Sequence, residues 1–145
     1  MVNPKIQILI GRDFPNKVIP LIKKAKHSIY IIVYDWYWYP NEIGENIQIF
    51  NNAIINAHKK GILVKAIVKD HKIYEILKRE YINVKRIKSS KTLHIKSMVL
   101  DNKILILGSH NYTKSAFNIN YEASVIIRDE KIALQYQDIF SDFFS

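Results

Sequence analysis

The sequence predicts a mixed α/β protein in which a mostly β-sheet core of about six or seven strands is flanked by helices on both faces. Short runs of apolar, β-branched residues alternate with segments whose apolar residues recur at helical spacing, and the last third of the chain holds several strand-like runs in succession. No Gly/Ser-rich linker interrupts the 145 residues. We therefore expect one domain that spans residues 1–145.

The first part of the chain is predicted to alternate strands with helices. Apolar residues at helical spacing indicate helices over residues 16–26 and 43–60. Pro20 falls in the opening turn of the first helix if Asn16 is its cap. Asp70 is placed to cap a third helix. Short apolar runs typical of strands lie between these helices: residues 6–10, 28–34, 62–68 and 82–87.

The second part is predicted to contain a hairpin, a further strand and a closing helix. Asp101 and Asn102 favour the tight turn of a hairpin between two strand-like runs. A short helix is expected near residues 113–117, and Asp129 is placed to cap the helix that closes the chain. The strand-like runs cover residues 93–100, 103–107 and 122–127.

The composition excludes several kinds of site. The chain has no cysteine, which rules out disulfides, thiolate metal sites, iron–sulfur clusters and a cysteine nucleophile. The 22 Lys and Arg against 13 Asp and Glu give a formal net charge of +9. This excess suggests a polyanionic partner, although solvated lysines would give the same count. No His-Glu-x-x-His pattern and no clustered carboxylates are present, so we expect no metal and no cofactor.

No segment of the sequence predicts export or membrane insertion. The first apolar run, residues 6–10, is too short for the core of a secretion signal. No apolar stretch approaches the roughly 20 residues of a membrane span. We therefore expect a cytoplasmic protein without stable membrane association.

Polar residues suited to phosphate chemistry gather in the second part. His94 and Lys96 lie two apart in a predicted strand, so they share one face, where they are costly unless an anion meets them. Ser109 and Asn111 follow the next strand and offer a hydroxyl, an amide and backbone N–H groups. Glu122 opens a later strand. It is placed to accept a hydrogen bond from one ring nitrogen of His94, which leaves the other free to attack.

A lone histidine on a strand is usually structural, so it is the whole set that indicates a site. Six fixed residues stand at the spacing His94-x-Lys96-x4-Asp101-x6-Gly108-Ser109-x-Asn111. This spacing resembles the motif of the phospholipase D superfamily at every defined position, and Glu122 resembles the acidic residue that the family places eleven positions later. The resemblance implies a phospholipase D-like nuclease fold and a single-motif, endonuclease-like member. Asp101, at the predicted hairpin tip, is expected to be a structural ion-pair partner.

The resemblance further implies metal-independent phosphodiester hydrolysis through a covalent phosphohistidine. In this family one motif histidine attacks phosphorus, a second protonates the leaving oxygen, and water resolves the intermediate. His94 is then the nucleophile or the acid. Lys96 and Asn111 bind the non-bridging phosphate oxygens, with Ser109 in support. Glu122 orients His94.

The single motif predicts a homodimer. In-line displacement at phosphorus needs a nucleophile on one side and a proton donor on the other. One His94 cannot occupy both places, and the full motif occurs once in the chain. A two-fold dimer that brings two copies of His94 and Lys96 across one phosphate meets this requirement.

The class of phosphodiester is left open by the motif. Chain length, the single motif and the positive charge favour an endonuclease that cuts DNA or RNA without sequence preference. A phospholipase D or cardiolipin-type lipid phosphodiesterase is the alternative, and a non-catalytic nucleic-acid-binding module is a third possibility. Four cations just before the motif either line an approach to the site or belong to a solvated loop: Lys85, Arg86, Lys88 and Lys91.

Residues 34–40 form an unusually aromatic segment, Tyr-Asp-Trp-Tyr-Trp-Tyr-Pro, between a predicted strand and a predicted helix. Strand ends lead into the ligand crevice of open α/β sheets. We therefore predict that Trp36 and Trp38 bind substrate by stacking on unpaired bases. The segment also suits a dimer interface, contact with a lipid surface or plain core packing.

Overall fold

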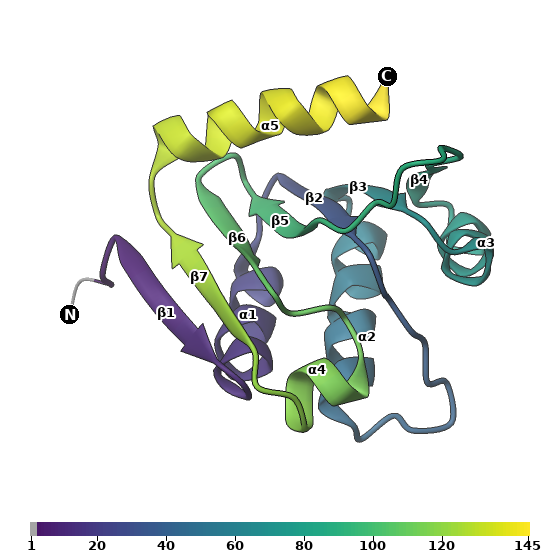
Figure 1. The fold of residues 1–145 in the computed structure, drawn as a ribbon, viewed down its shortest axis with the longest axis horizontal. Helices are drawn as coiled ribbons and strands as arrows, with labels where there is room; N and C mark the ends of the chain where they lie inside the picture. Colours follow the sequence, from purple (N-terminus) through teal and green to yellow (C-terminus); the bar gives the residue numbers. More distant parts are fainter. Residues whose placement is uncertain (1–2) are drawn as a thin grey trace.

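The computed structural model describes residues 3–145 of the chain. Within that range, seven strands form one mixed sheet and five helices cover it (Figure 1), which confirms the predicted fold class. The strands are β1 (Ile6–Ile10), β2 (Ser28–Val33), β3 (Leu63–Val68), β4 (Asn83–Arg86), β5 (Lys96–Leu100), β6 (Ile104–Gly108) and β7 (Ala123–Ile127). The helices are α1 (Asp13–Lys24), α2 (Asn46–Lys59), α3 (His71–Arg79), α4 (Lys114–Asn118) and α5 (Glu130–Phe144).

The strand order across the sheet is β1-β7-β6-β5-β2-β3-β4. β2, β3 and β4 are parallel neighbours, joined by α2 and α3 as crossover connections, and the other neighbours pair antiparallel. All six residues of β2 are buried. A strand covered on both faces carries a nearly continuous apolar run, which explains the sequence Ser-Ile-Tyr-Ile-Ile-Val.

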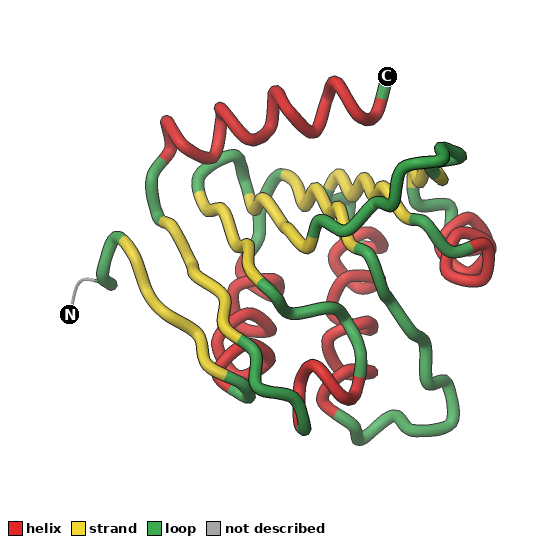
Figure 2. Tube along the Cα trace, viewed as in Figure 1, coloured by secondary structure: helices red, strands yellow, loops and turns green. Residues whose placement is uncertain are grey.

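Each face of the sheet has its own apolar core, so the sheet is the middle layer of three. On one face, α1 and α2 bury side chains such as Val18 and Phe50. On the other face, α5 crosses the sheet (Figures 1 and 2) and buries Ala133 and Phe140. The ring of Phe140 stacks on that of Tyr30 with 5.0 Å between centroids.

β5 and β6 form the predicted hairpin. Asp101 (φ 56°) and Asn102 (φ 53°) both adopt the left-handed backbone that these residue types tolerate, and the N–H of Lys103 donates to the carbonyl of Leu100 at 3.0 Å, which closes the turn. The Asp101 carboxylate accepts hydrogen bonds from three consecutive backbone N–H groups, residues 26–28, which fastens the turn to the start of β2. Burial alone would raise the pKa of Asp101, but these donors lower it below its ordinary value. Asp101 therefore has the structural position that was expected. The prediction that it forms an ion pair is wrong, because its hydrogen-bond partners are backbone N–H groups.

Two helices begin at other residues than their periodicity predicts. α1 begins at Asp13 rather than Asn16, and the Asp13 carboxylate accepts the backbone N–H of the residue three positions earlier at 3.0 Å. Pro20 therefore lies inside the helix rather than in its first turn. Proline has no N–H, so the carbonyl of Asn16 lacks its helical partner. Both residues are exposed, and this carbonyl can therefore bond to water. α2 begins at Asn46 because Ile43 points into solvent and does not extend the buried stripe.

β5 begins at Lys96, three residues later than predicted. Lys96 pairs with Val33, the last residue of β2. β2 therefore ends before it can pair with the residues that precede Lys96. His94 lies among those residues, in the segment that leads into β5.

Candidate active site

The polar residues of the motif meet at one end of the sheet. β2 ends and β5 begins there, because Val33 pairs with Lys96, and β6 ends beside them. The segment after β6 also lies against the start of β7, since Ser109 N–H donates to the carbonyl of Ala123 at 3.0 Å. This arrangement gathers residues that are far apart in the sequence: Tyr34, Asp35, His94, Lys96, Ser109, Asn111 and Glu122.

His94 and Lys96 point to the same side, as predicted. Nζ of Lys96 lies 2.8 Å from Nδ1 of His94 and 3.3 Å from its Nε2, so the ammonium donates a hydrogen bond to the ring. His94 is exposed and Lys96 is half-buried. Burial lowers the pKa of Lys96, and the carboxylates of Glu122 and Asp35 offset part of this. A partly desolvated ammonium of this kind is suited to bind an anion.

Tyr34 belongs to this cluster, although within the aromatic segment 34–40 the sequence analysis assigned substrate binding only to Trp36 and Trp38. Its ring lies 4.8 Å from the ring of His94, between centroids. The Nζ atoms of Lys69 and Lys96 lie 3.9 Å and 5.5 Å from the centre of the same ring. Cations are attracted to the face of an aromatic ring, so Tyr34 holds two lysines close to His94. Its position directly after a buried strand was the signal that could have identified it.

Ser109 and Glu122 form a pair of their own. Ser109 Oγ donates to Oε1 of Glu122 at 2.5 Å and accepts the backbone N–H of Ala123 at 3.0 Å. Asn120 Nδ2 donates to the second carboxylate oxygen at 3.0 Å. Both oxygens of Glu122 are thus engaged, and among residues 3–145 the predicted hydrogen bond from His94 to Glu122 is not formed. The start of β7 places Glu122 against Ser109 instead.

Gly108 and His110 hold the loop after β6 in place. A Cβ atom at Gly108 would lie 2.4 Å from the Cα of Ser124, so only glycine fits. His110 is buried and stacks on Phe14 at 4.5 Å. Its Nε2 donates to the carbonyl of Gly11 at 2.9 Å, and its Nδ1 lies 2.7 Å from Oγ of Ser124. Burial lowers the pKa of His110, which favours the neutral ring. Sequence reasoning missed this positioning residue because its partners are distant in the chain.

Asn111 lies across from the end of β2. Its Oδ1 accepts the backbone N–H of Asp35 at 3.1 Å. Next to it, the backbone N–H of Tyr112 donates to the carbonyl of Asp35 at 2.9 Å, and Trp36 and Tyr112 form a parallel bridge. Because Oδ1 is engaged in this way, Nδ2 is the group of Asn111 that can donate to a phosphate oxygen.

Two of the predicted site residues lie elsewhere. Asp101 is at the opposite end of β5 from Lys96, outside the cluster. Trp36 is 2% exposed, and its indole N–H donates to Oδ1 of Asn51 at 2.7 Å. Its ring is part of the core and is not open for stacking, contrary to the prediction. Trp38 is half-buried, with its ring 6.1 Å from that of Trp36.

Among residues 3–145 there is no group of three or more His, Asp or Glu side chains placed to hold a metal ion. No helix in this range has both the length and the apolar character needed to cross a membrane.

Comparison with known proteins gives the family. Residues 18–144 match the model of the family named cardiolipin synthase, phospholipase D-like domain. The chain belongs to this phospholipase D-like family. It is also similar to phospholipase D of Rickettsia prowazekii (strain Madrid E), with 32% identity over 132 residues that cover 86% of this chain and 60% of the relative. The chain thus spans about 60% of the length of that curated relative.

Solved structures show how this phospholipase D-like chain folds. Nuc from Salmonella typhimurium, a phospholipase D family member, superposes with a TM-score of 0.80 at 23% identity and covers 97% of this chain and 93% of its own. NucT from Helicobacter pylori superposes with a TM-score of 0.72 at 23% identity, covering 95% and 94%. These likenesses confirm the predicted phospholipase D-like nuclease fold.

Proposed function

We propose that this chain is a metal-independent phosphodiesterase and that its substrate is nucleic acid. The observation that carries the proposal is the pairing of the partly desolvated Lys96 ammonium with the exposed ring of His94, at the strand ends where Asn111 is held through its Oδ1 and keeps Nδ2 as a donor. Donors that converge on one open point stabilise the charge of a phosphoryl group in transfer. Membership in the phospholipase D-like family supports the same chemistry.

In the proposed reaction, a ring nitrogen of His94 attacks phosphorus, and the bond to the leaving oxygen breaks as the N–P bond forms. A second histidine donates a proton to the leaving oxygen. Water then attacks phosphorus, the N–P bond breaks, and the proton from water returns to the second histidine. Lys96 and Asn111 hold the non-bridging oxygens, so the hydrogen bond between Lys96 and His94 gives way to bonds with phosphate.

The second histidine comes from a second copy of the chain. The outer face of β1 supports such a dimer: Ile6, Ile8 and Ile10 are 61%, 67% and 57% exposed, side by side on one edge of the sheet. An apolar stripe of this kind marks an interaction surface. It is continuous with the proposed site, because Ile10 pairs with Ala123, the neighbour of Glu122. In the dimer, the Glu122 carboxylate of one copy can orient His94 of the other, a role that it does not take within its own chain.

Charge favours nucleic acid over lipid as the substrate. The net charge of +9 is doubled in a dimer and attracts a phosphate backbone. A lipid phosphodiesterase is the second candidate, because the Rickettsia relative is named a phospholipase D. A purely binding role has no use for a histidine held against a lysine.

Cleavage in excess EDTA tests the proposal. Plasmid and single-stranded DNA are incubated with wild type and with His94→Ala. We expect cleavage by wild type alone. If neither protein cleaves DNA but both bind it in a salt-sensitive way, the chain is a nucleic-acid-binding module. If wild type hydrolyses cardiolipin but not DNA, the chain is a lipid phosphodiesterase.

A further inference from the structure

A hollow of about 920 Å³ opens between the aromatic segment after β2 and helix α3. Five consecutive residues, 36–40, form one wall. The other wall is α3, with the apolar side chains of Ile73 and Ile76 and the cations Lys72 and Arg79. Neither His94 nor Lys96 lines it. The volume is in the range of pockets that hold a nucleotide-sized ligand.

A short series of contacts connects this hollow with the proposed active site. The ring of Tyr34 touches His94 on one side and carries Nζ of Lys69 at 3.9 Å. Asp70, the next residue, lines the hollow. Tyr37, also in the lining, has a pKa raised chiefly by Asp35 and further by burial and by Asp70. The hollow is therefore linked to the active-site cluster through Tyr34 and the consecutive residues Lys69 and Asp70.

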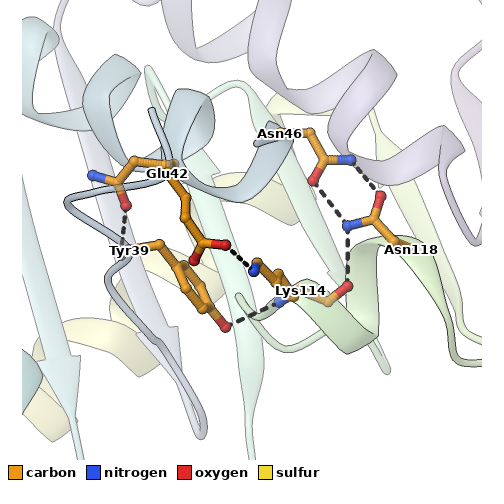
Figure 3. A network of polar contacts seen from close by, with 6 residues as sticks. Tyr39, Glu42, Asn46, Lys114 and Asn118 are labelled. Atoms are coloured by element: carbon orange, nitrogen blue, oxygen red, sulfur yellow. Dashed lines mark hydrogen bonds and ion pairs between the residues drawn. The ribbon is translucent and has the colours of Figure 1, made fainter. Parts of the chain in front are cut away.

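Polar contacts hold the aromatic segment and the residues after it against the body of the protein (Figure 3). The hydroxyl of Tyr39 accepts the backbone N–H of Lys114 at 3.3 Å, and Nζ of Lys114 pairs with Glu42. The amides of Asn46 and Asn118 form two hydrogen bonds, at 2.8 and 3.1 Å. These contacts tie the loop to α4. A wall fixed in this way needs little further ordering when a ligand binds.

Charges of both signs line the hollow: the cations Lys72 and Arg79, and the carboxylates Asp70 and Glu80. Among residues 3–145, no carboxylate lies within ion-pair distance of Lys69, Lys72 or Arg79. Asp70 lines the hollow too, but its carboxylate caps α3 by accepting the N–H of Lys72 at 2.6 Å. A second, smaller hollow on α3 is lined by three of the cations noted in the sequence: Lys85, Arg86 and Lys88.

We propose that the hollow binds an unpaired nucleobase of the strand whose phosphate lies at His94. This inference rests on the proposed function and narrows its substrate to single-stranded or locally unpaired nucleic acid. The rings of Tyr37 and Trp38 supply stacking surface, which is sequence-tolerant because every base has a π-face. Lys72 and Arg79 meet the neighbouring phosphates. An acyl chain would pack on Ile73 and Ile76 but would leave both cations without a counterpart.

Tryptophan fluorescence reports on this hollow, because the half-buried Trp38 lines it, whereas the ring of Trp36 is buried in the core. A ten-nucleotide oligo(dT) and an abasic decamer with the same phosphates are titrated into His94→Ala protein, which cannot consume the strand. We expect oligo(dT) to quench the emission and to bind at least about fivefold more tightly than the abasic strand. Equal affinity for the two strands would overturn the proposal.

Variants of Tyr37 separate stacking from general attraction. Tyr37 is 47% exposed, so its replacement does not open the core. We expect Tyr37→Ala to weaken oligo(dT) binding about fivefold or more, to leave abasic binding unchanged, and to be rescued by Tyr37→Phe. The matched control is Tyr81→Asn, since Tyr81 is 89% exposed, lies outside the lining, and has a positive φ that asparagine accepts. An unchanged oligo(dT) affinity in Tyr37→Ala would contradict the proposal.

The test distinguishes this inference from the proposed function. A chain that discriminates oligo(dT) from the abasic strand but does not cleave DNA in EDTA would refute the activity and leave the base site standing. A chain that cleaves without this discrimination would refute the base site alone. Quenching by cardiolipin vesicles that Tyr37→Ala abolishes, with no response to oligo(dT), would assign the hollow to lipid and overturn the proposal.

Discussion

Lys96 and Asp101 lie at opposite ends of β5 and illustrate how the chain uses its charged groups. Lys96 is partly desolvated and faces the open end of the sheet, where its ammonium contacts His94. Asp101 is satisfied by backbone N–H groups at the closed end. The motif therefore combines a residue of the proposed site, Lys96, with a residue that holds a turn, Asp101. Their different hydrogen-bond partners show which role each one has.

Replacement of Asp101 is expected to lower stability and not activity. Asp101→Ala removes the acceptor of three backbone N–H groups and should reduce the free energy of unfolding by about 2–3 kcal/mol. Because the pKa of Asp101 is lowered in the folded state, its contribution is present above the ordinary carboxyl pKa and is lost as the pH falls below about 4. The difference from wild type should thus shrink in acid.

Urea unfolding at pH 7 and in acid, together with DNA cleavage per folded molecule, checks this prediction. Asp101→Asn is the matched control, since asparagine accepts the left-handed backbone and keeps one acceptor oxygen. A large loss of cleavage in a chain of unchanged stability would mean that Asp101 takes part in the reaction.

At the scale of elements, local signals were enough for the hairpin but not for the site contacts. Asp101 and Asn102 predicted the β5–β6 turn because two adjacent left-handed residues specify it. The burial of Trp36 depends on Asn51 in α2, and the position of Glu122 depends on how β7 meets Ser109. These contacts join distant parts of the chain, so periodicity and spacing could not predict them.

The same limit applies to the edge of the sheet. The apolar run 6–10 predicted a strand, which the structure confirms as β1. The strand order of the structure places β1 at the edge, and the exposure of Ile6, Ile8 and Ile10 shows that no other element covers them. Alternate residues of a strand share a face, so these three side chains form one continuous stripe.

A charge placed in this stripe is expected to separate the proposed dimer. Ile8→Lys should convert the protein to a monomer, because a lysine in an apolar interface must lose its hydration. It should also abolish cleavage, since each copy then has one His94 only. Light scattering and the EDTA cleavage assay measure the two effects.

Leu63→Lys is the control for this change. Leu63 is an exposed apolar strand residue at the start of β3, away from β1. It should leave both the dimer and the cleavage intact. A wild-type protein that cleaves as a strict monomer, or an Ile8→Lys protein that remains dimeric, would contradict the shared site.

At the scale of the whole molecule, the sheet connects two surfaces with different chemistry. Its antiparallel end carries the apolar stripe of β1, and its parallel end carries the cations and the aromatic hollow beside α3. The cluster of His94, Lys96 and Asn111 lies near the strand ends between them. A second copy on the apolar side and a polyanionic strand on the basic side would therefore meet at the same histidine.

In the proposed reaction His94 becomes covalently attached to phosphorus, and the trapped adduct can be detected on the histidine itself. Wild type is mixed with single-stranded DNA in excess EDTA, denatured at neutral pH within a turnover, digested with trypsin and analysed by mass spectrometry. His94 lies in the short tryptic peptide 92–96. We predict a phosphoryl-linked DNA fragment on this peptide. We expect none on the corresponding peptide 92–103 of Lys96→Ala protein, which lacks the tryptic site at residue 96 as well as the phosphate-binding ammonium. Metal-free DNA turnover without any adduct on His94 would contradict the mechanism.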